Sequence, residues 1–160
     1  MAVELKQSNQ ITYPIVKWVG GKRQLMFELL KNLPKSYNRY FEPFIGGGAL
    51  FFELQPDHAY ISDMNEELIN LYSVVRDSVD ELIEDLSKHE ISKEYFLEIR
   101  NIDRTEEYSK LSNVERASRF IYLNRTCFNG MYRVNSKGEF NVPFGNYKNP
   151  RIIDENNLLN

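Results

Sequence analysis

The sequence contains very little cysteine and histidine, the residues that build most disulfides and transition-metal sites. Cys127 is the single cysteine, so an internal disulfide is excluded. The two histidines, His58 and His89, are far apart and have no cysteine or histidine companions at the spacing of metal ligands. We therefore expect no bound metal, and an ordinary buried thiol at Cys127.

Long apolar segments are missing as well. The sequence has no signal peptide and no apolar run of the roughly 18 residues that would suggest a membrane span. We therefore expect a cytoplasmic protein with no membrane partner. With 160 residues, of which 42% are hydrophobic, the chain has the size and composition of one folded domain.

The segment 39–52 is the part around which the chain is organised. Its aromatic and apolar residues end in three consecutive glycines, Gly46, Gly47 and Gly48, and an apolar segment without helix breakers follows. This pattern predicts a strand, a tight turn and a helix that begins near Ala49. Glycines leave no side chain between the backbone and a ligand, and a helix start presents unpaired amides. We predict a ligand-binding corner.

Asp63 completes this corner in the sequence. It follows a predicted strand over residues 58–62 and stands 17 residues after Gly46, close to the distance at which a βαβ unit places an acidic residue on ribose hydroxyls. Phe51 occupies the position of the third glycine of a dinucleotide motif. A nucleoside without pyrophosphate, such as S-adenosylmethionine, therefore fits better than NAD. The alternative is a structural turn beside a solvated Asp63.

A second glycine pair lies nearer the N-terminus. The pattern predicts a short strand over residues 14–18, a Gly-Gly turn and a helix over residues 22–32. A Walker loop is excluded, because a valine stands at its first glycine and an arginine at its metal-binding hydroxyl. Trp18 and Lys22 flank the turn and are placed to cover an adenosine and to hold a carboxylate. The alternative places Trp18 in the core and Lys22 on the surface.

After Asp63 the pattern is helical as far as residue 127, with no strand signal. We interpret residues 65–127 as short helices of a subdomain inserted after the second strand. The acidic excess of this region is typical of a solvated helical face. Four residues are predicted to cap its helices, two of them in capping boxes that begin at serine: Asn65, Ser78, Ser92 and Ser112.

Residues 128–150 differ in character from the helices before them. Residues 119–151 carry six Lys or Arg against one Glu, interleaved with aromatics and asparagines, which is typical of a nucleic-acid surface. Residues 132–135 and 139–142 flank a Ser-Lys-Gly turn and predict a β-hairpin. Hairpins of this kind enter DNA grooves; the alternative is a hairpin packed on its own subdomain.

The side chains of this predicted hairpin suit base contacts. Arg133 can make a bidentate contact to guanine, and Met131 or Pro143 an apolar contact to a thymine methyl group. Phe128 can stack where a base has left the helix.

Three stretches together resemble the adenine-specific DNA methyltransferases of the Dam type. They are residues 17–22, residues 41–48 with Asp63, and residues 124–148, in the family's order and spacing. The likeness is greatest to restriction-modification enzymes that methylate GATC. It implies an α/β, Rossmann-like S-adenosylmethionine-dependent fold, with a helical target-recognition subdomain inserted. The residues that would contact or shape the site of S-adenosylmethionine are Trp18, Lys22, Gly46, Gly47, Gly48 and Asp63.

The same resemblance implies roles in binding double-stranded DNA. Lys17 and Arg133 would read the outer guanines, while Met131 and Pro143 would contact the thymine. Phe128 would wedge into the duplex, where other members carry a different aromatic ring. Asn129 would hold a phosphate.

One feature of the family is absent: its catalytic Asp-Pro-Pro-Tyr motif, since the chain has no Pro-Pro dipeptide. We interpret the chain as an N-terminal part of such an enzyme, inactive alone, whose partner is the missing C-terminal part. Residues 1–64 would begin the methyltransferase core, residues 65–150 would recognise DNA, and residues 151–160 would return to the core.

Two other functions stay open from the residues alone. One is a non-catalytic DNA-binding module or regulatory fragment. The other is a different nucleotide enzyme, for which no catalytic set is found. A cytosine-C5 methyltransferase is disfavoured, because Thr126 precedes Cys127 where that family has proline.

Overall fold

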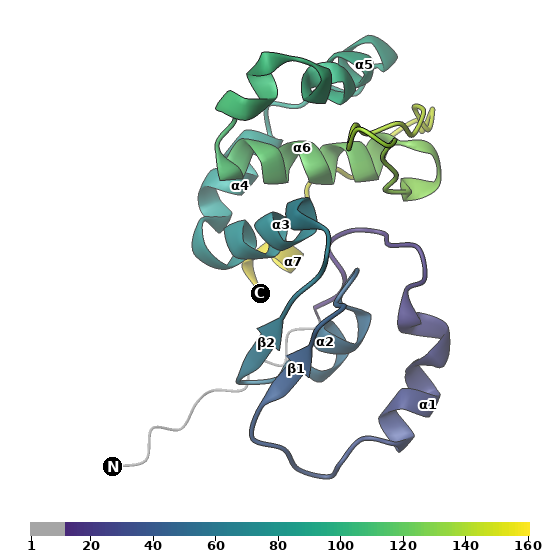
Figure 1. The fold of residues 1–160 in the computed structure, drawn as a ribbon, viewed down its shortest axis with the longest axis vertical. Coiled ribbons are helices and arrows are strands. Elements are labelled where there is room, and N and C mark those ends of the chain that lie inside the picture. Colours follow the sequence, from purple (N-terminus) through teal and green to yellow (C-terminus); the bar gives the residue numbers. More distant parts are fainter. Residues whose placement is uncertain (1–11) are drawn as a thin grey trace.

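The computed structural model describes residues 12–160 and shows a mixed α/β fold with a small sheet (Figure 1). Two strands and the first two α-helices form the lower part in this view, and α3 to α6 form the upper part. In chain order the elements are η1 (Lys22–Leu25), α1 (Met26–Lys31), β1 (Tyr40–Glu42), α2 (Ala49–Leu54), β2 (Ala59–Ile61), α3 (Glu66–Asp77), α4 (Val79–Leu86), α5 (Lys93–Asn101), η2 (Ile102–Arg104), η3 (Glu106–Lys110), α6 (Asn113–Thr126), η4 (Phe128–Gly130) and α7 (Glu155–Leu159).

The predicted strand, turn and helix around the three glycines are confirmed. β1 and β2 are parallel, with Phe41 opposite Tyr60, and α2 is the crossover between them. The Tyr40 ring lies 6.4 Å from the ring of Phe51 on α2, so this helix covers one face of the strand pair. The carboxyl ends of both strands therefore point toward the same edge, where the glycine turn and Asp63 lie.

The helices predicted over residues 65–127 are also present, and no strand lies among them. α3 and α4 pack on α6, the longest helix of the described chain, which crosses the upper part in Figure 1. Their apolar faces contribute most of one buried cluster, which also includes Ile15, Val16 and Ile45 from the N-terminal part. A single core thus joins the two parts, and the domain division at residue 64 stays a prediction.

Three of the four predicted caps are confirmed. The side chains of Asn65, Ser92 and Ser112 accept backbone hydrogen bonds at the starts of α3, α5 and α6. Ser112 and Glu115 form the complete capping box. The capping box at Ser78 is wrong. Its backbone ends α3 and begins α4 at once, with φ −150° and ψ 44°, and its side chain makes no capping bond.

The strand predicted over residues 14–18 is wrong, and the reason is visible in its hydrogen bonds. Asn157 accepts from the N–H of Tyr13 and donates to its carbonyl, both at 2.9 Å. Arg125 donates to the carbonyl of Ile15 at 2.6 Å. Asn124 likewise accepts from the N–H of Lys17 and donates to its carbonyl, both at 2.9 Å. Side chains of α6 and α7 therefore satisfy this extended segment in place of a neighbouring strand.

The predicted hairpin is confirmed as a turn but not as two regular strands. Val134 and Phe140 form a single antiparallel bridge, flanked by backbone hydrogen bonds from Asn135 to Glu139 and from Asn141 to Arg133. The side chain of Asn135 accepts from the amides of Lys137 and Glu139 and so closes the turn itself. The N–H of Phe140 points away from Val134 and donates to Asp103 at 2.7 Å, which ties the turn to η2.

No helix in residues 12–160 is both long enough and apolar enough to cross a membrane.

We predict that Asn124→Ala lowers the free energy of unfolding by about 2 to 4 kcal/mol, because it leaves buried backbone groups of Lys17 and Gly130 without partners. Asn70→Ala is the control, since that amide makes one exposed bond to the carbonyl of Asn113. Its loss should stay below about 1 kcal/mol. Urea unfolding followed by fluorescence of the single tryptophan measures both; equal losses would contradict the prediction.

Candidate functional site

The glycine turn has a backbone that requires glycine. Gly46 and Gly48 are left-handed, with φ of 52° and 70°. The hydroxyl of Tyr72 on α3 donates to the carbonyl of Gly46 at 2.9 Å, and burial raises the pKa of this tyrosine, which keeps it a donor. The turn is therefore fixed from the side of the helical part.

Asp63 holds the turn from the other side. One carboxylate oxygen accepts from the N–H of Gly46 at 2.9 Å, and the other accepts from the N–H of Asn65 at 3.0 Å. A carboxylate has about four acceptor positions, so both oxygens can still accept from a ligand hydroxyl. The 17-residue spacing thus brings together the two groups that the sequence paired.

Trp18 lies directly against the glycine turn. A Cβ on Gly46 would be 2.8 Å from its Cδ1, and one on Gly47 would be 3.1 Å from its Cβ. The indole also stacks with Tyr132 at 5.5 Å between ring centroids. Trp18 is half-buried and packs partly on the core, while its role in covering an adenosine stays a prediction.

Lys22 is paired with a residue that sequence reasoning missed. Its Nζ lies 3.7 Å from Oε1 of Glu42, which is 8% exposed, and 3.5 Å from the carbonyl of Phe44. The hydroxyl of Tyr40 donates to the other oxygen of Glu42 at 2.7 Å. The signal available in the sequence was an acidic residue at the end of a short apolar strand, immediately before the turn.

Four of the predicted DNA-contacting residues come together beside this corner. The side chain of Lys17 crosses Gly130, where an added Cβ would be 2.5 Å from its Cδ. Phe128 is 49% exposed, and its N–H donates to the carbonyl of Pro143 at 2.8 Å. Asn129 is left-handed, with φ 57°, and its N–H donates to the hydroxyl of Tyr147. The loop therefore presents Phe128, Asn129 and Pro143 on one side of Lys17.

The other two candidates differ in exposure. Arg133 is exposed, and its Nε donates to the Oδ1 of Asn141 at 2.7 Å, which orients the guanidinium without burying it. Met131 is half-buried and packs on the second buried cluster, around Phe96 and Tyr122.

Half of the basic residues in 119–151 pair with groups of the protein itself. Arg119 is buried, donates to the carbonyl of Ile99 and pairs with Asp103 at 2.8 Å. Arg125 holds Ile15, and Arg151 pairs with Asp154 at 2.7 Å. Four residues of this run are exposed, one of them in the ion pair with Asp154: Arg133, Lys137, Lys148 and Arg151. The charge count alone therefore overstated the basic surface.

The buried thiol predicted at Cys127 is confirmed. Its Sγ donates to the carbonyl of Met131 at 3.1 Å, and burial raises its pKa to about 11. A thiol with this pKa is protonated at neutral pH, so Cys127 does not serve as a nucleophile.

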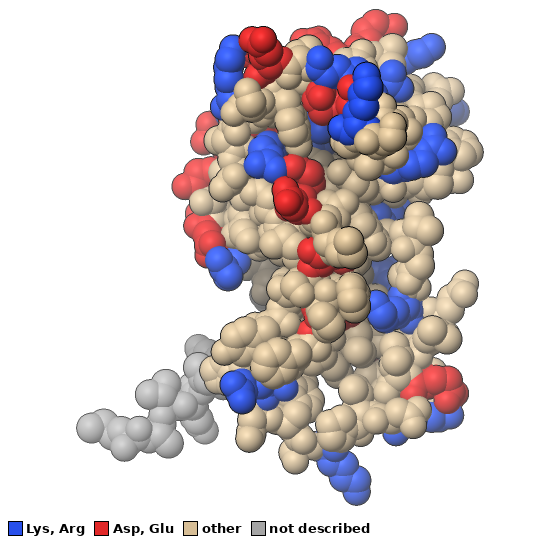
Figure 2. Space-filling view, viewed as in Figure 1, with Lys and Arg blue, Asp and Glu red and all other residues tan. Residues whose placement is uncertain are grey.

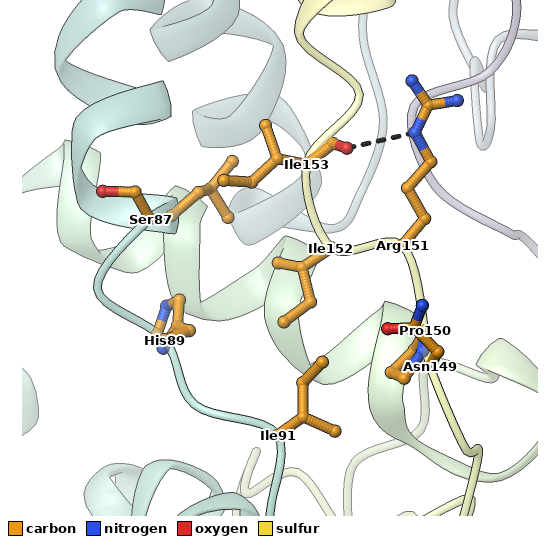
Figure 3. A pocket seen from close by; sticks show the side chains of 9 residues that line it. Ser87, His89, Ile91, Asn149, Pro150, Arg151, Ile152 and Ile153 are labelled. Carbon is orange, nitrogen blue, oxygen red and sulfur yellow. Dashed lines mark hydrogen bonds between the residues drawn. The ribbon is translucent and has the colours of Figure 1, made fainter.

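A pocket lies away from this site, between the end of α4 and residues 149–153 (Figure 3). His89 lines it, but both ring nitrogens are engaged, with the Tyr95 hydroxyl at 2.9 Å and the Ser118 hydroxyl at 3.0 Å. Burial lowers the pKa of His89 to about 4, so its ring is neutral at pH 7. This histidine is part of the packing of the helical region.

Among residues 12–160, no group of three or more His, Cys, Asp or Glu is arranged to hold a metal.

Comparison with known proteins identifies the family. The profile of the D12 class N6 adenine-specific DNA methyltransferases matches residues 18–160. The chain belongs to this family. The match includes the glycine turn, Asp63 and residues 128–148.

Relatives come from several organisms. The Type II methyltransferase M1.LlaDCHI of Lactococcus lactis subsp. cremoris is 54% identical over 156 residues, which is 96% of this chain and 55% of the relative. The Type II methyltransferase M.MjaIII of Methanocaldococcus jannaschii is 45% identical, over 92% of this chain and 57% of the relative. The DNA adenine methylase of Haemophilus influenzae is 40% identical, over 84% and 48%. The chain thus spans about half the length of these curated relatives.

We predict that Gly46→Ala destabilises the protein more than Gly138→Ala. Both glycines have positive φ, so alanine costs about 1 to 2 kcal/mol of backbone strain at each. Only at Gly46 does the new methyl also meet Trp18, which adds about 1 to 3 kcal/mol of overpacking, whereas nothing lies within 4 Å at Gly138. Urea unfolding compares the two; equal losses would show that Trp18 yields without cost.

Proposed function

We propose that this chain supplies the cofactor and target-recognition parts of an S-adenosylmethionine-dependent methyltransferase that modifies adenine N6 in double-stranded DNA, with GATC as its target. In this proposal the βαβ corner begins a Rossmann-like core, and the helical part with its loop is inserted in it. The protein acts in the cytoplasm. Transfer requires the family's Asp-Pro-Pro-Tyr groups, so the chain alone is inactive and works with a C-terminal part.

One observation supports this proposal above the others: Trp18 lies between the two candidate regions. It lies against Gly46 and Gly47 and also stacks with Tyr132, next to Arg133. Adenine methylation requires a base extruded from the duplex to meet the cofactor methyl group. A corner for the cofactor that shares a wall with a DNA-facing loop suits that requirement.

The cofactor is supported by the chemistry of the corner. Asp63 offers carboxylate oxygens for ribose hydroxyls, and its bond to Gly46 holds the left-handed turn open beside them. Lys22 offers an ammonium group for the carboxylate of the methionine moiety. Glu42, beside Lys22, offers a buried carboxylate for the amino group of the methionine moiety. No pyrophosphate is needed for any of these contacts.

DNA recognition is supported by the loop geometry. Phe128 is exposed shortly after the end of α6, and the left-handed Asn129 follows it. Lys17 lies against Gly130, Arg133 follows that glycine by three residues, and both are exposed. Such an arrangement suits two guanine contacts separated by an inserted aromatic ring.

We predict that Asp63→Ala weakens binding of S-adenosylhomocysteine by about tenfold or more, because a charged acceptor for the ribose is lost. Calorimetry on a folded variant measures this. Asp57→Ala is the control, since Asp57 is an exposed carboxylate that precedes the amino end of β2, whereas Asp63 follows its carboxyl end. NAD should bind more weakly than S-adenosylhomocysteine; the reverse order, or full binding by Asp63→Ala, would remove the cofactor assignment.

A second prediction tests the DNA assignment. Arg133→Ala should reduce discrimination of GATC from scrambled duplexes by about 1 to 3 kcal/mol, the usual value of a bidentate guanine contact. Lys137→Ala, at the exposed turn, should weaken all duplexes equally and flatten the salt dependence. Binding is measured at two salt concentrations by fluorescence anisotropy. Equal affinity of the unmutated chain for GATC and scrambled duplexes would leave only a nonspecific basic surface.

A further inference from the structure

Several cations of the helical part pair with carboxylates of the same part. Figure 2 shows acidic and basic side chains close together over the upper, helical part of the molecule. One pair, Asp103 and Arg104 on η2, also holds backbone groups of the hairpin turn. Nη1 of Arg104 lies 2.6 Å from Oδ1 of Asp103, whose side chain is 7% exposed. This pair therefore does more than balance charge.

Phe140 is the residue that the pair holds. Its N–H donates to Oδ2 of Asp103 at 2.7 Å, and its carbonyl accepts from Nη2 of Arg104, also at 2.7 Å. Two consecutive side chains thus bond both backbone polar groups of one residue. Phe140 is itself buried in the second cluster, so its side chain is fixed as well. The hairpin turn is therefore attached to η2 at this residue.

The peptide group between Phe140 and Asn141 carries this restraint to Arg133. Its carbonyl is the one that Arg104 bonds, and its N–H donates to the carbonyl of Arg133 at 3.0 Å. Because a peptide group is planar and rigid, these two bonds are fixed relative to each other. Asn141 then holds the Arg133 side chain, through Oδ1 to Nε at 2.7 Å and through its carbonyl to Nη2 at 3.4 Å. One peptide group and one asparagine thus connect Arg104 to Arg133.

The bonds from Asn141 orient the Arg133 guanidinium without using it up. A guanidinium has more N–H donors than Asn141 takes, so donors remain for a bidentate contact. Such a contact requires the donor group to be placed within about 0.5 Å of its productive position. An arginine that is already oriented also loses less side-chain freedom on binding. The placement of Arg133 therefore depends on how firmly Asn141 is held.

We propose that Asp103 and Arg104 are positioning residues for base readout: they hold the Phe140–Asn141 peptide group so that Asn141 presents the Arg133 guanidinium for its guanine contact. The inference rests on the proposed function, in which Arg133 reads an outer guanine. It adds that target selectivity is set partly on η2, by residues that act through Arg133 and make no base contact.

The test begins with Arg104→Ala, because the Arg104 side chain is 29% exposed, whereas Asp103 is buried and also pairs with Arg119. We expect discrimination between GATC and scrambled duplexes to fall by about fivefold or more, with the loss in Arg133→Ala as its upper limit. Affinity for the scrambled duplex and its salt dependence should stay unchanged, since no phosphate contact is lost. Fluorescence anisotropy at two salt concentrations measures both.

Two further variants control for charge and for location. Arg104→Lys keeps the positive charge, but one ammonium cannot take the places of both terminal nitrogens of the planar guanidinium. It should therefore lose discrimination as Arg104→Ala does. Lys110→Ala removes an exposed cation on η3 that pairs with Glu107, and it should leave discrimination unchanged. Urea unfolding establishes that each variant is folded.

A double variant distinguishes action through Arg133 from independent action. In an Arg133→Ala background, Arg104→Ala should cause no further loss of discrimination, because the side chain that it positions is gone. A second loss of the same size would show that Arg104 acts on its own, which would overturn the inference.

A measurement without DNA tests the structural step separately. The Nε–H resonance of Arg133, identified by its absence in Arg133→Ala, should exchange with water more slowly than that of a free arginine side chain, since it donates to Asn141. Arg104→Ala should accelerate this exchange, and Lys110→Ala should not. Unchanged exchange in Arg104→Ala would show that η2 does not hold Arg133 in place.

Other results would also overturn the inference. Full discrimination by both Arg104 variants would exclude a role in readout, and equal weakening of all duplexes would make Arg104 a phosphate contact. Loss of folding in both variants would assign the pair to the fold alone. Equal affinity of the unmutated chain for GATC and scrambled duplexes would instead refute the proposed function, and the exchange measurement would still report whether η2 holds Arg133.

Discussion

The attachment of residues 13–17 to α6 and α7 is the interaction on which the rest of the arrangement depends. Asn157, Arg125 and Asn124 bond alternate residues of this segment, as a neighbouring strand would. These three side chains fix the direction of the segment, so that the next residue, Trp18, lies against the glycine turn. The same Asn124 amide also donates to the carbonyl of Gly130, at 2.9 Å. One buried side chain therefore ties the segment before Trp18 to the loop at Gly130.

The glycine corner is held in place before any ligand arrives. Asp63 accepts from the N–H of Gly46 and Tyr72 donates to its carbonyl, so both backbone polar groups of this residue are oriented from outside the turn. Asp63 thereby combines a structural bond with a free capacity to accept others. Because this backbone is already ordered, binding a ligand here costs less conformational entropy than binding at a loop that must first become ordered. This explains how a short segment with three glycines forms a defined site.

Charge serves the fold as much as the surface. Arg119 and Arg104 both pair with Asp103, which also accepts from the N–H of Phe140 and so anchors the hairpin turn to the helices. Arg116 pairs with Glu67 and joins α6 to α3. These cations neutralise carboxylates of the acidic helical region. Arg133, Lys137 and Lys148 lie outside these ion pairs and are exposed.

The sequence by itself determined the local features: the βαβ corner, the caps at Asn65, Ser92 and Ser112, the buried Cys127 and the motif series of the family. Each depends on residues close in the chain, where spacing translates directly into geometry. Tertiary structure decided the rest. Residues 14–18 are not a strand because helix side chains from more than 100 positions away take their backbone bonds. Arg119 and Arg125 are internal because their partners lie on other elements, and Glu42 joins Lys22 because β1 brings it there. Periodicity and composition carry no information about such long-range partners.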